Sequence, residues 1–196
     1  FPIETTEVHE NGVVYIGDGF RIEARPLRHR IDAWGYALIE EDRPGRFDVE
    51  TAKRLGVPPG PLFGKLQAGN AVTLDDGTVV EPTDVLGPSR PGLKIVYCTD
   101  TSPCESAVEL ARDADVLIHE STYLAGEEKL AHQRGHSTAA DAARCAAEAG
   151  ARQLVLTHVS QKYPRTEPLV EQAAKIFDNV IGARDLLELE VERRDS

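Results

Sequence analysis

The pattern of apolar and polar residues changes along the chain and separates a middle segment from the rest. Phe20–Pro26 alternates apolar and polar residues and Ala33–Ile39 is largely apolar, so both segments predict strands. From Glu40 to about Gly92 the chain is rich in glycine and proline, and a short helical pattern covers Val49–Leu55. A segment of this length with so little regular pattern is usually functional or mobile. We therefore expect an arm inserted in a domain.

Beyond this segment the chain alternates between strand and helix patterns. The helix pattern at Thr138–Ala149 is rich in alanine, Ser137 or Thr138 can cap its start, and Gly150 can end it. Strands that alternate with helices predict an α/β layered domain. The other predicted elements are strands at Leu93–Cys98, Asp115–His119, Gln153–Val159 and Asp185–Val191, helices at Glu105–Arg112 and Pro168–Phe177, and an edge segment or hairpin at Glu4–Val14.

The composition suits one soluble domain. The chain has 196 residues, of which 41% are hydrophobic. No apolar run approaches the roughly 20 residues that cross a bilayer, and nothing resembles a signal peptide, so we expect a cytoplasmic protein with no membrane partner. Cys98, Cys104 and Cys145 are odd in number and form no Cys-x-x-Cys pair. We expect reduced thiols and neither a disulfide nor a metal site from them.

The charge distribution limits where a nucleic acid could bind. The formal net charge is −11, whereas a sequence-independent nucleic-acid-binding surface is normally basic. The segment from Arg43 to Gly69 is an exception, with five basic and two acidic residues. On charge alone it is either an ordinary solvated loop or a local RNA contact. The basic residues are Arg43, Arg46, Lys53, Arg54 and Lys65, and the acidic ones are Asp48 and Glu50.

Three polar residues directly follow predicted strands. These are His29, Asp100 and His158. Ligand sites in open α/β folds gather at the carboxyl ends of strands, and imidazole nitrogen and carboxylate oxygen are ligands of catalytic zinc. Each residue has a structural alternative, because Asp-Thr after a strand is a common turn and a histidine there is often hydrogen-bonded within the fold. The three together favour a metal site.

A second polar cluster lies between these positions. His119-Glu120-Ser121-Thr122 closes a predicted strand, and Gly135-His136-Ser137-Thr138 opens a predicted helix. A histidine beside a helix N-terminus lies near backbone N–H groups that suit a phosphate. A nearby glutamate can hold that imidazole protonated as a general acid. The alternative is that Glu120 and His136 only tie a loop to a helix cap.

The order and spacing of these motifs resemble short-form ribonuclease Z, of the metallo-β-lactamase superfamily, along nearly the whole chain. A Pro-Pro-Gly-Pro arm distinguishes that family from other hydrolases with this fold. The motifs are, in order, Leu27-Arg28-His29, Trp34-Gly35-Tyr36, Gly56-Val57-Pro58-Pro59-Gly60-Pro61, Lys65-Leu66-Gln67-Ala68-Gly69, Asp100-Thr101, His119-Glu120-Ser121-Thr122-Tyr123, Gly135-His136-Ser137-Thr138-Ala139-Ala140 and Leu156-Thr157-His158-Val159-Ser160.

The resemblance implies a fold and an activity. Residues 1–196 would form the C-terminal portion of one metallo-β-lactamase-type domain, an αββα sandwich without its N-terminal part. Residues from about 43 to 70 would form an inserted flexible exosite arm that holds tRNA. The implied enzyme is a zinc-dependent endoribonuclease that cuts the 3′ trailer from precursor tRNA and leaves a tRNA 3′-hydroxyl and a trailer 5′-phosphate. The family usually works as a homodimer.

The resemblance also implies residue roles. His29 would bind the first of two zinc ions, His158 the second, and Asp100 would bridge both. His136 would lie near the scissile phosphate, and Glu120 is the acidic residue of the family's His-Glu-Ala-Thr motif. The arm residues implied in RNA binding are Arg43, Arg46, Lys53, Arg54, Gly60, Pro61 and Lys65.

Two departures from the family limit this expectation. Thr99 replaces a glycine in the family's Ser-Gly-Asp-Thr motif. The family's His-x-His-x-Asp-His motif, which supplies further zinc ligands and the proposed base, does not occur, so the ligand set is incomplete. We expect these 196 residues alone to bind two zinc ions weakly or not at all, to lack cleavage activity, and to associate through exposed apolar surface. The alternatives are a non-catalytic RNA-binding or scaffold module and another phosphodiesterase of the same fold.

Overall fold

The computed structural model describes residues 5–193, which form two compact units. The first unit combines the chain up to Glu40 with Leu93–Glu192, and the body of the second is Glu41–Gly92. Within the described part of the chain, no helix has the length and apolar character needed to cross a membrane.

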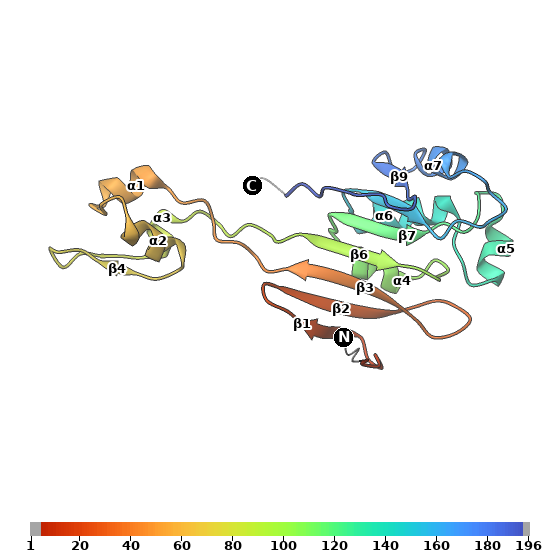
Figure 1. Ribbon diagram of the computed structural model, residues 1–196, viewed down its shortest axis with the longest axis horizontal. Coiled ribbons are helices and arrows are strands. Elements are labelled where there is room, and N and C mark those ends of the chain that lie inside the picture. The colour runs from red at the N-terminus through yellow and green to blue at the C-terminus, as the bar shows by residue number, and fades with distance from the viewer. Residues whose placement is uncertain (1–4, 194–196) are drawn as a thin grey trace. The chain divides into compact units, whose positions relative to one another are not determined.

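A seven-stranded sheet forms the centre of the first unit, in the order β1-β2-β3-β6-β7-β8-β9 (Figure 1). On one side of the sheet, β1, β2, β3 and β6 pair antiparallel with their neighbours. On the other side, β6, β7, β8 and β9 pair parallel. Parallel neighbours need crossover connections, and helices supply them here. The strands are β1 (Gly12–Ile16), β2 (Phe20–Leu27), β3 (Ala33–Glu40), β6 (Lys94–Cys98), β7 (Val116–Glu120), β8 (Leu154–Thr157) and β9 (Val180–Gly182).

Helices cover one face of this sheet, where α4 (Glu105–Ala111) packs on β2, β3 and β6 and α6 (Ala139–Ala149) packs on β7 and β8. The contact side of α6 consists mainly of buried alanines, and such small side chains let a helix lie close to a sheet. The core between the helices and the sheet includes Val96, Leu117 and Leu156, which have no exposed surface. The crossover helix before β9 is α7 (Glu167–Ala173), and α5 (Glu128–Gln133) precedes α6. All three cysteines are free thiols.

Apolar side chains lie exposed on the other face of the sheet. Successive residues of a strand point to opposite faces, so Tyr36 and Leu38 point away from the side on which Ala37 is buried. Tyr36 pairs in register with Tyr97 of β6, which is exposed as well. These residues leave apolar surface on the sheet face that the helices do not cover.

The start and end of α6 follow the residues that its sequence offers for capping. Thr138 is the N-cap and forms a capping box with Asp141, and Gly150 ends the helix in the left-handed region at φ 65°. Burial alone would raise the pKa of Asp141, but hydrogen bonds from His132 and Thr138 hold it below its usual value. The cap therefore fixes the chain directly after the loop that carries His136.

The second unit has its own small core. Its elements are α1 (Val49–Arg54), α2 (Pro61–Gln67), the paired strands β4 (Val72–Thr73) and β5 (Val79–Val80), and α3 (Pro82–Val85). The Phe47 and Phe63 rings lie beside this core with their centroids 4.9 Å apart. The fully or almost fully buried residues of the core are Ala52, Val57, Leu66, Val72, Val80 and Val85.

The helix predicted at Val49–Leu55 is confirmed, whereas the strand predicted at Asp185–Val191 is wrong. The alternating leucines and glutamates that follow β9, the last strand of the sheet order, form no strand. Leu186 lies in a turn of this segment and is 99% exposed. At the other end of the chain β1 begins at Gly12, and Glu4, where the predicted opening segment starts, lies outside the described residues.

Candidate active site

The candidate site lies where three neighbouring parallel strands end. Cys98 of β6 pairs with His119 of β7, and Glu120 at the end of β7 pairs with Thr157 of β8. The carboxyl ends of β6, β7 and β8 therefore lie side by side at one edge of the sheet, which is the usual location of ligand sites in α/β folds. Asp100, Glu120 and His158 all reach this edge, as the sequence predicts.

Two of these residues have an uncommon backbone conformation. Asp100 has φ 55° and His158 has φ 52°, both in the left-handed region that favours glycine. The strain costs about 1–3 kcal/mol for each residue and concentrates at functional sites in proteins. It turns both side chains toward the same point immediately after their strands, so that Asp100 Oδ1 and His158 Nε2 lie 3.1 Å apart.

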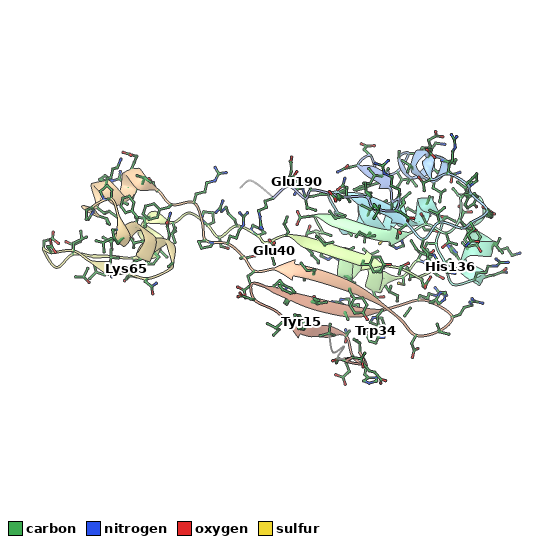
Figure 2. All side chains as sticks on the ribbon, in the orientation of Figure 1. Tyr15, Trp34, Glu40, Lys65, His136 and Glu190 are labelled. Atoms are coloured by element: carbon green, nitrogen blue, oxygen red, sulfur yellow. The ribbon has the colours of Figure 1, made fainter. Side chains whose placement is uncertain are left out.

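His136 joins this pair from the loop before α6. His136 lies beyond the carboxyl ends of the central strands (Figure 2). Its ring stacks on that of His158 with centroids 5.3 Å apart, and its Nδ1 is 3.8 Å from Asp100 Oδ1. Together with Glu120, these residues form a group whose potential ligand atoms all lie within 4.8 Å of one another.

Glu120 is fully buried, and hydrogen bonds occupy both of its oxygens. Oε1 accepts from the Thr101 backbone N–H at 2.6 Å and from His136 Nδ1 at 2.9 Å. Oε2 accepts from the Thr122 hydroxyl at 2.5 Å and from the Ser137 backbone N–H at 3.1 Å. The Thr122 backbone N–H lies 3.4 Å from Oε2 as well. Both carboxylate oxygens are thus engaged as acceptors within the protein, and one of these contacts is with His136.

Hydrogen bonds also set which nitrogen each histidine presents. A carboxylate or carbonyl oxygen only accepts, so His136 Nδ1 donates to Glu120 and His29 Nδ1 donates to the Gly135 carbonyl at 2.8 Å. Both rings consequently present Nε2. Hydrogen bonds of this kind, from a carboxylate or a backbone carbonyl to the other ring nitrogen, fix the tautomer of metal-binding histidines.

His29 lies next to this group but outside it. Its ring centroid is 5.0 Å from that of His136. The position of the His29 ring against the backbone of Gly135 requires a glycine there. An added Cβ at Gly135 would lie 2.7 Å from His29 Nδ1, and the φ of this residue is 82°. Only a residue without a side chain allows this approach.

The donor set fits a zinc-type cation. Asp100 can supply a carboxylate oxygen and His158 an imidazole nitrogen, which are ligand types of catalytic zinc sites, and His136 belongs to the same group of side chains. The short separation of Asp100 Oδ1 and His158 Nε2 brings together two lone pairs, which is favourable only with a proton or a cation between them. Of the three predicted ligands, the structure thus brings Asp100 and His158 together and places His29 beside them.

The basic residues predicted to bind RNA all lie in the second unit, and nearby groups hold several of them. Lys53 pairs with Glu50 at 2.9 Å, and Arg54 donates to the Thr51 hydroxyl at 3.0 Å. Gly60 has φ 138° and precedes Pro61, the first residue of α2. The glycine thus starts this helix with a backbone conformation that other residues rarely adopt.

Sequence reasoning missed the residues that support Glu120. Thr101 and Thr122 donate to its carboxylate, and His119 Nδ1 donates to its backbone carbonyl at 2.7 Å. His119 is only 2% exposed, and burial lowers its pKa. A glutamate at the end of a buried strand needs hydrogen-bond donors, and the adjacent hydroxyl residues were the signal that could have identified them.

Comparison with known proteins identifies relatives along nearly the whole chain. Residues 69–159 match the Beta-lactamase superfamily domain. Ribonuclease Z of Myxococcus xanthus is 48% identical over 198 residues, covering 100% of this chain and 64% of the relative. Ribonuclease Z of Methanosarcina acetivorans is 50% identical over 184 residues, covering 93% of this chain and 60% of the relative. The chain thus spans somewhat less than two thirds of these relatives' length.

Solved structures give the fold independently. The metallo-β-lactamase fold protein YhfI from Bacillus subtilis has a TM-score of 0.59 at 19% identity, over 91% of this chain and 52% of that protein. The short form of human tRNase Z has a TM-score of 0.56 at 24% identity, over 92% of this chain and 46% of that protein. The chain therefore has the metallo-β-lactamase fold, and its sequence is similar to that of ribonuclease Z along nearly its whole length.

Proposed function

We propose that the protein carrying this chain is a zinc-dependent endoribonuclease that removes the 3′ trailer from precursor tRNA. The observation that carries the proposal is the group formed by Asp100, His136 and His158 around the buried carboxylate of Glu120. The likeness to ribonuclease Z at 44–50% identity supports the same activity.

Zinc is the proposed metal, and this chain contributes part of its binding site. His29 would bind the first zinc ion and His158 the second, and Asp100 would contribute to both. Bound zinc would supply positive charge for the phosphate oxygens and make water acidic enough to attack near neutral pH. The strained backbone at Asp100 and His158 supports this assignment, since both side chains are aimed before any metal binds.

His136 and Glu120 are the proposed acid and its partner. A protonated His136 carries one proton on Nδ1, held by Glu120 at 2.9 Å, and a second on Nε2. We assign the Nε2 proton to the leaving 3′-oxygen. The bond between phosphorus and that oxygen breaks, and the oxygen takes the proton. The attacking water loses one proton to solvent, and its oxygen stays on the phosphate with the other hydrogen. The products are a tRNA 3′-hydroxyl and a trailer with a 5′-phosphate.

The arm at residues 43–70 is the proposed tRNA contact away from the site of cleavage. Its basic residues would bind phosphates, which supply affinity and position without reading sequence. We further propose a cytoplasmic homodimer, in which the arm of one subunit holds the tRNA for the active site of the other. The net positive charge of this segment supports the RNA contact, because the rest of the chain is acidic.

A cleavage assay tests the proposal. Protein from its native source is given precursor tRNA with a labelled trailer, and His136→Ala is compared with His9→Ala, whose side chain is exposed. Loss of a general acid lowers the rate about 10²–10⁴-fold. We expect that loss for His136→Ala and an unchanged rate for His9→Ala. Equal rates in the two variants would remove His136 from the mechanism.

A further inference from the structure

The Thr122 hydroxyl lies between the two halves of the candidate site. Thr122 is buried, and its Oγ1 is 2.5 Å from Glu120 Oε2 and 2.9 Å from His158 Nδ1. It also lies 3.1 Å from the backbone carbonyl of His158. One oxygen atom therefore touches the residue that holds His136 and the residue that pairs with Asp100.

The single proton of this hydroxyl can serve one strong bond. A hydroxyl donates once and accepts through its lone pairs, whereas an ionised carboxylate only accepts. The contact with Glu120 is the shortest and falls in the range of about 2.5–2.7 Å typical of charge-assisted O–H···O⁻ bonds. The Thr122 proton therefore points to Glu120, and the carbonyl of His158 receives at most a weak share of it.

The direction of the hydrogen bond from Thr122 to Glu120 determines whether Nδ1 of His158 carries a hydrogen. If Thr122 donates to Glu120, its contact with His158 at 2.9 Å forms only when His158 Nδ1 carries a hydrogen. Nε2 of His158 then faces Asp100 Oδ1, 3.1 Å away, with room between the two atoms for a metal ion or, in the metal-free protein, for a second proton. The opposite tautomer would require the Thr122 proton to leave the shorter bond with Glu120.

We propose that Thr122 is a positioning residue that orders the protons of the site. Its hydroxyl oxygen accepts a hydrogen bond from Nδ1 of His158, so that Nε2 is the ring nitrogen that faces a metal. Its hydroxyl hydrogen bonds to Glu120, which links His158 to the pair formed by His136 and Glu120. The identity of the metal rests on the proposed function, whereas the direction of the hydrogen bonds does not. Within residues 5–193, Thr99 offers a contrast, because its hydroxyl is buried without a hydrogen-bond partner.

The test reads the ring nitrogens of the metal-free protein directly. Long-range ¹H–¹⁵N correlation spectra distinguish a protonated from an unprotonated imidazole nitrogen. We expect His158 Nδ1 to stay protonated in the wild type and in Thr122→Ser, which keeps the hydroxyl. In Thr122→Val the hydrogen should move to Nε2, where Asp100 accepts it. Thr99→Val removes a hydroxyl one residue from Asp100 and should leave His158 unchanged.

Zinc affinity of the same variants gives a second readout. Loss of a hydrogen-bond partner of a metal-binding residue typically weakens metal binding about 10–100-fold. We expect this loss of zinc affinity in Thr122→Val and an affinity close to that of the wild type in Thr122→Ser. An unprotonated His158 Nδ1 in the wild type, or no change of tautomer in Thr122→Val, would overturn the proposal. Both readouts use the full-length protein that carries this chain. A tautomer change in full-length protein that does not bind zinc would support the role of Thr122 and contradict the proposed function.

Discussion

His136 Nδ1 lies 2.9 Å from Oε1 of Glu120, whose side chain has no exposed surface. A buried carboxylate with a full set of donors is a rigid support, because moving it would leave several N–H and O–H groups without acceptors. The orientation of His136 is therefore set by the interior of the protein.

The first prediction concerns the charge of Glu120. Glu120→Gln keeps the shape but replaces one accepting oxygen by an NH2 group, which then faces a donor. We expect the free energy of unfolding to fall by about 1–3 kcal/mol or more. Denaturant titration measures it, with Glu105→Gln as the matched control, since Glu105 is exposed on α4. Equal stability of the two variants would show that the buried hydrogen bonds carry little energy.

The second prediction concerns the close approach of Gly135 to His29. In Gly135→Ala the new methyl group would lie 2.7 Å from His29 Nδ1. Overpacking of this kind typically costs about 1–3 kcal/mol, in addition to the strain of the backbone. Gly126→Ala is the control, because its φ of 97° is similar and an added Cβ there meets open space. We expect Gly135→Ala to unfold at lower denaturant than the control and to shift the NMR signals of the His29 ring.

The third prediction concerns pH and His119. Burial lowers the pKa of His119 from its usual 6.5, so the unfolded chain binds a proton there more readily than the folded protein. The stability that neutral His119 provides is fully present above about pH 6.5 and is lost as the pH falls. The slope for one proton approaches about 1.4 kcal/mol per pH unit.

Unfolding titrations between about pH 7.5 and about pH 5.5, roughly one pH unit on either side of the usual histidine pKa of about 6.5, test this prediction. His119→Gln should lose part of the slope, while His9→Gln should retain it because His9 is exposed. An identical slope in wild type and His119→Gln would assign the pH dependence to other groups.

The fourth prediction concerns the arm. Lys65 and Lys175 are both exposed, and neither forms an ion pair within the described residues. If Lys65 contacts a phosphate, Lys65→Gln should weaken tRNA binding and reduce the slope of log affinity against log salt by about 1. Lys175→Gln in the first unit should leave the slope unchanged. A filter-binding series over salt concentration measures both, and equal slopes would argue against phosphate contact by Lys65.

Prediction from sequence worked where the fold has simple geometric rules. The carboxyl ends of parallel strands meet at one edge, so Asp100 and His158 could be expected together from their positions alone. The cap of α6 followed from Thr138 and Gly150, because capping chemistry is local.

Features that depend on neighbours in space were not predictable. The alternation at Asp185–Val191 resembles a strand, but a strand also needs a partner strand to hydrogen-bond with, and the pattern of one segment does not show whether it reaches one. The donors of Thr101 and Thr122 matter only because β7 ends between β6 and β8 and places Glu120 beside them. The short helix α2 was missed since its seven residues carry too little periodic signal.

Metal-dependent cleavage of precursor tRNA is the most direct test of the central claim. Protein from its native source is treated with a chelator, assayed, supplied with zinc, and assayed again. We expect cleavage to be lost and then restored, with a tRNA 3′-hydroxyl and a trailer 5′-phosphate as products. Cleavage that survives removal of the metal, or zinc-loaded protein that cuts no precursor tRNA, would contradict it.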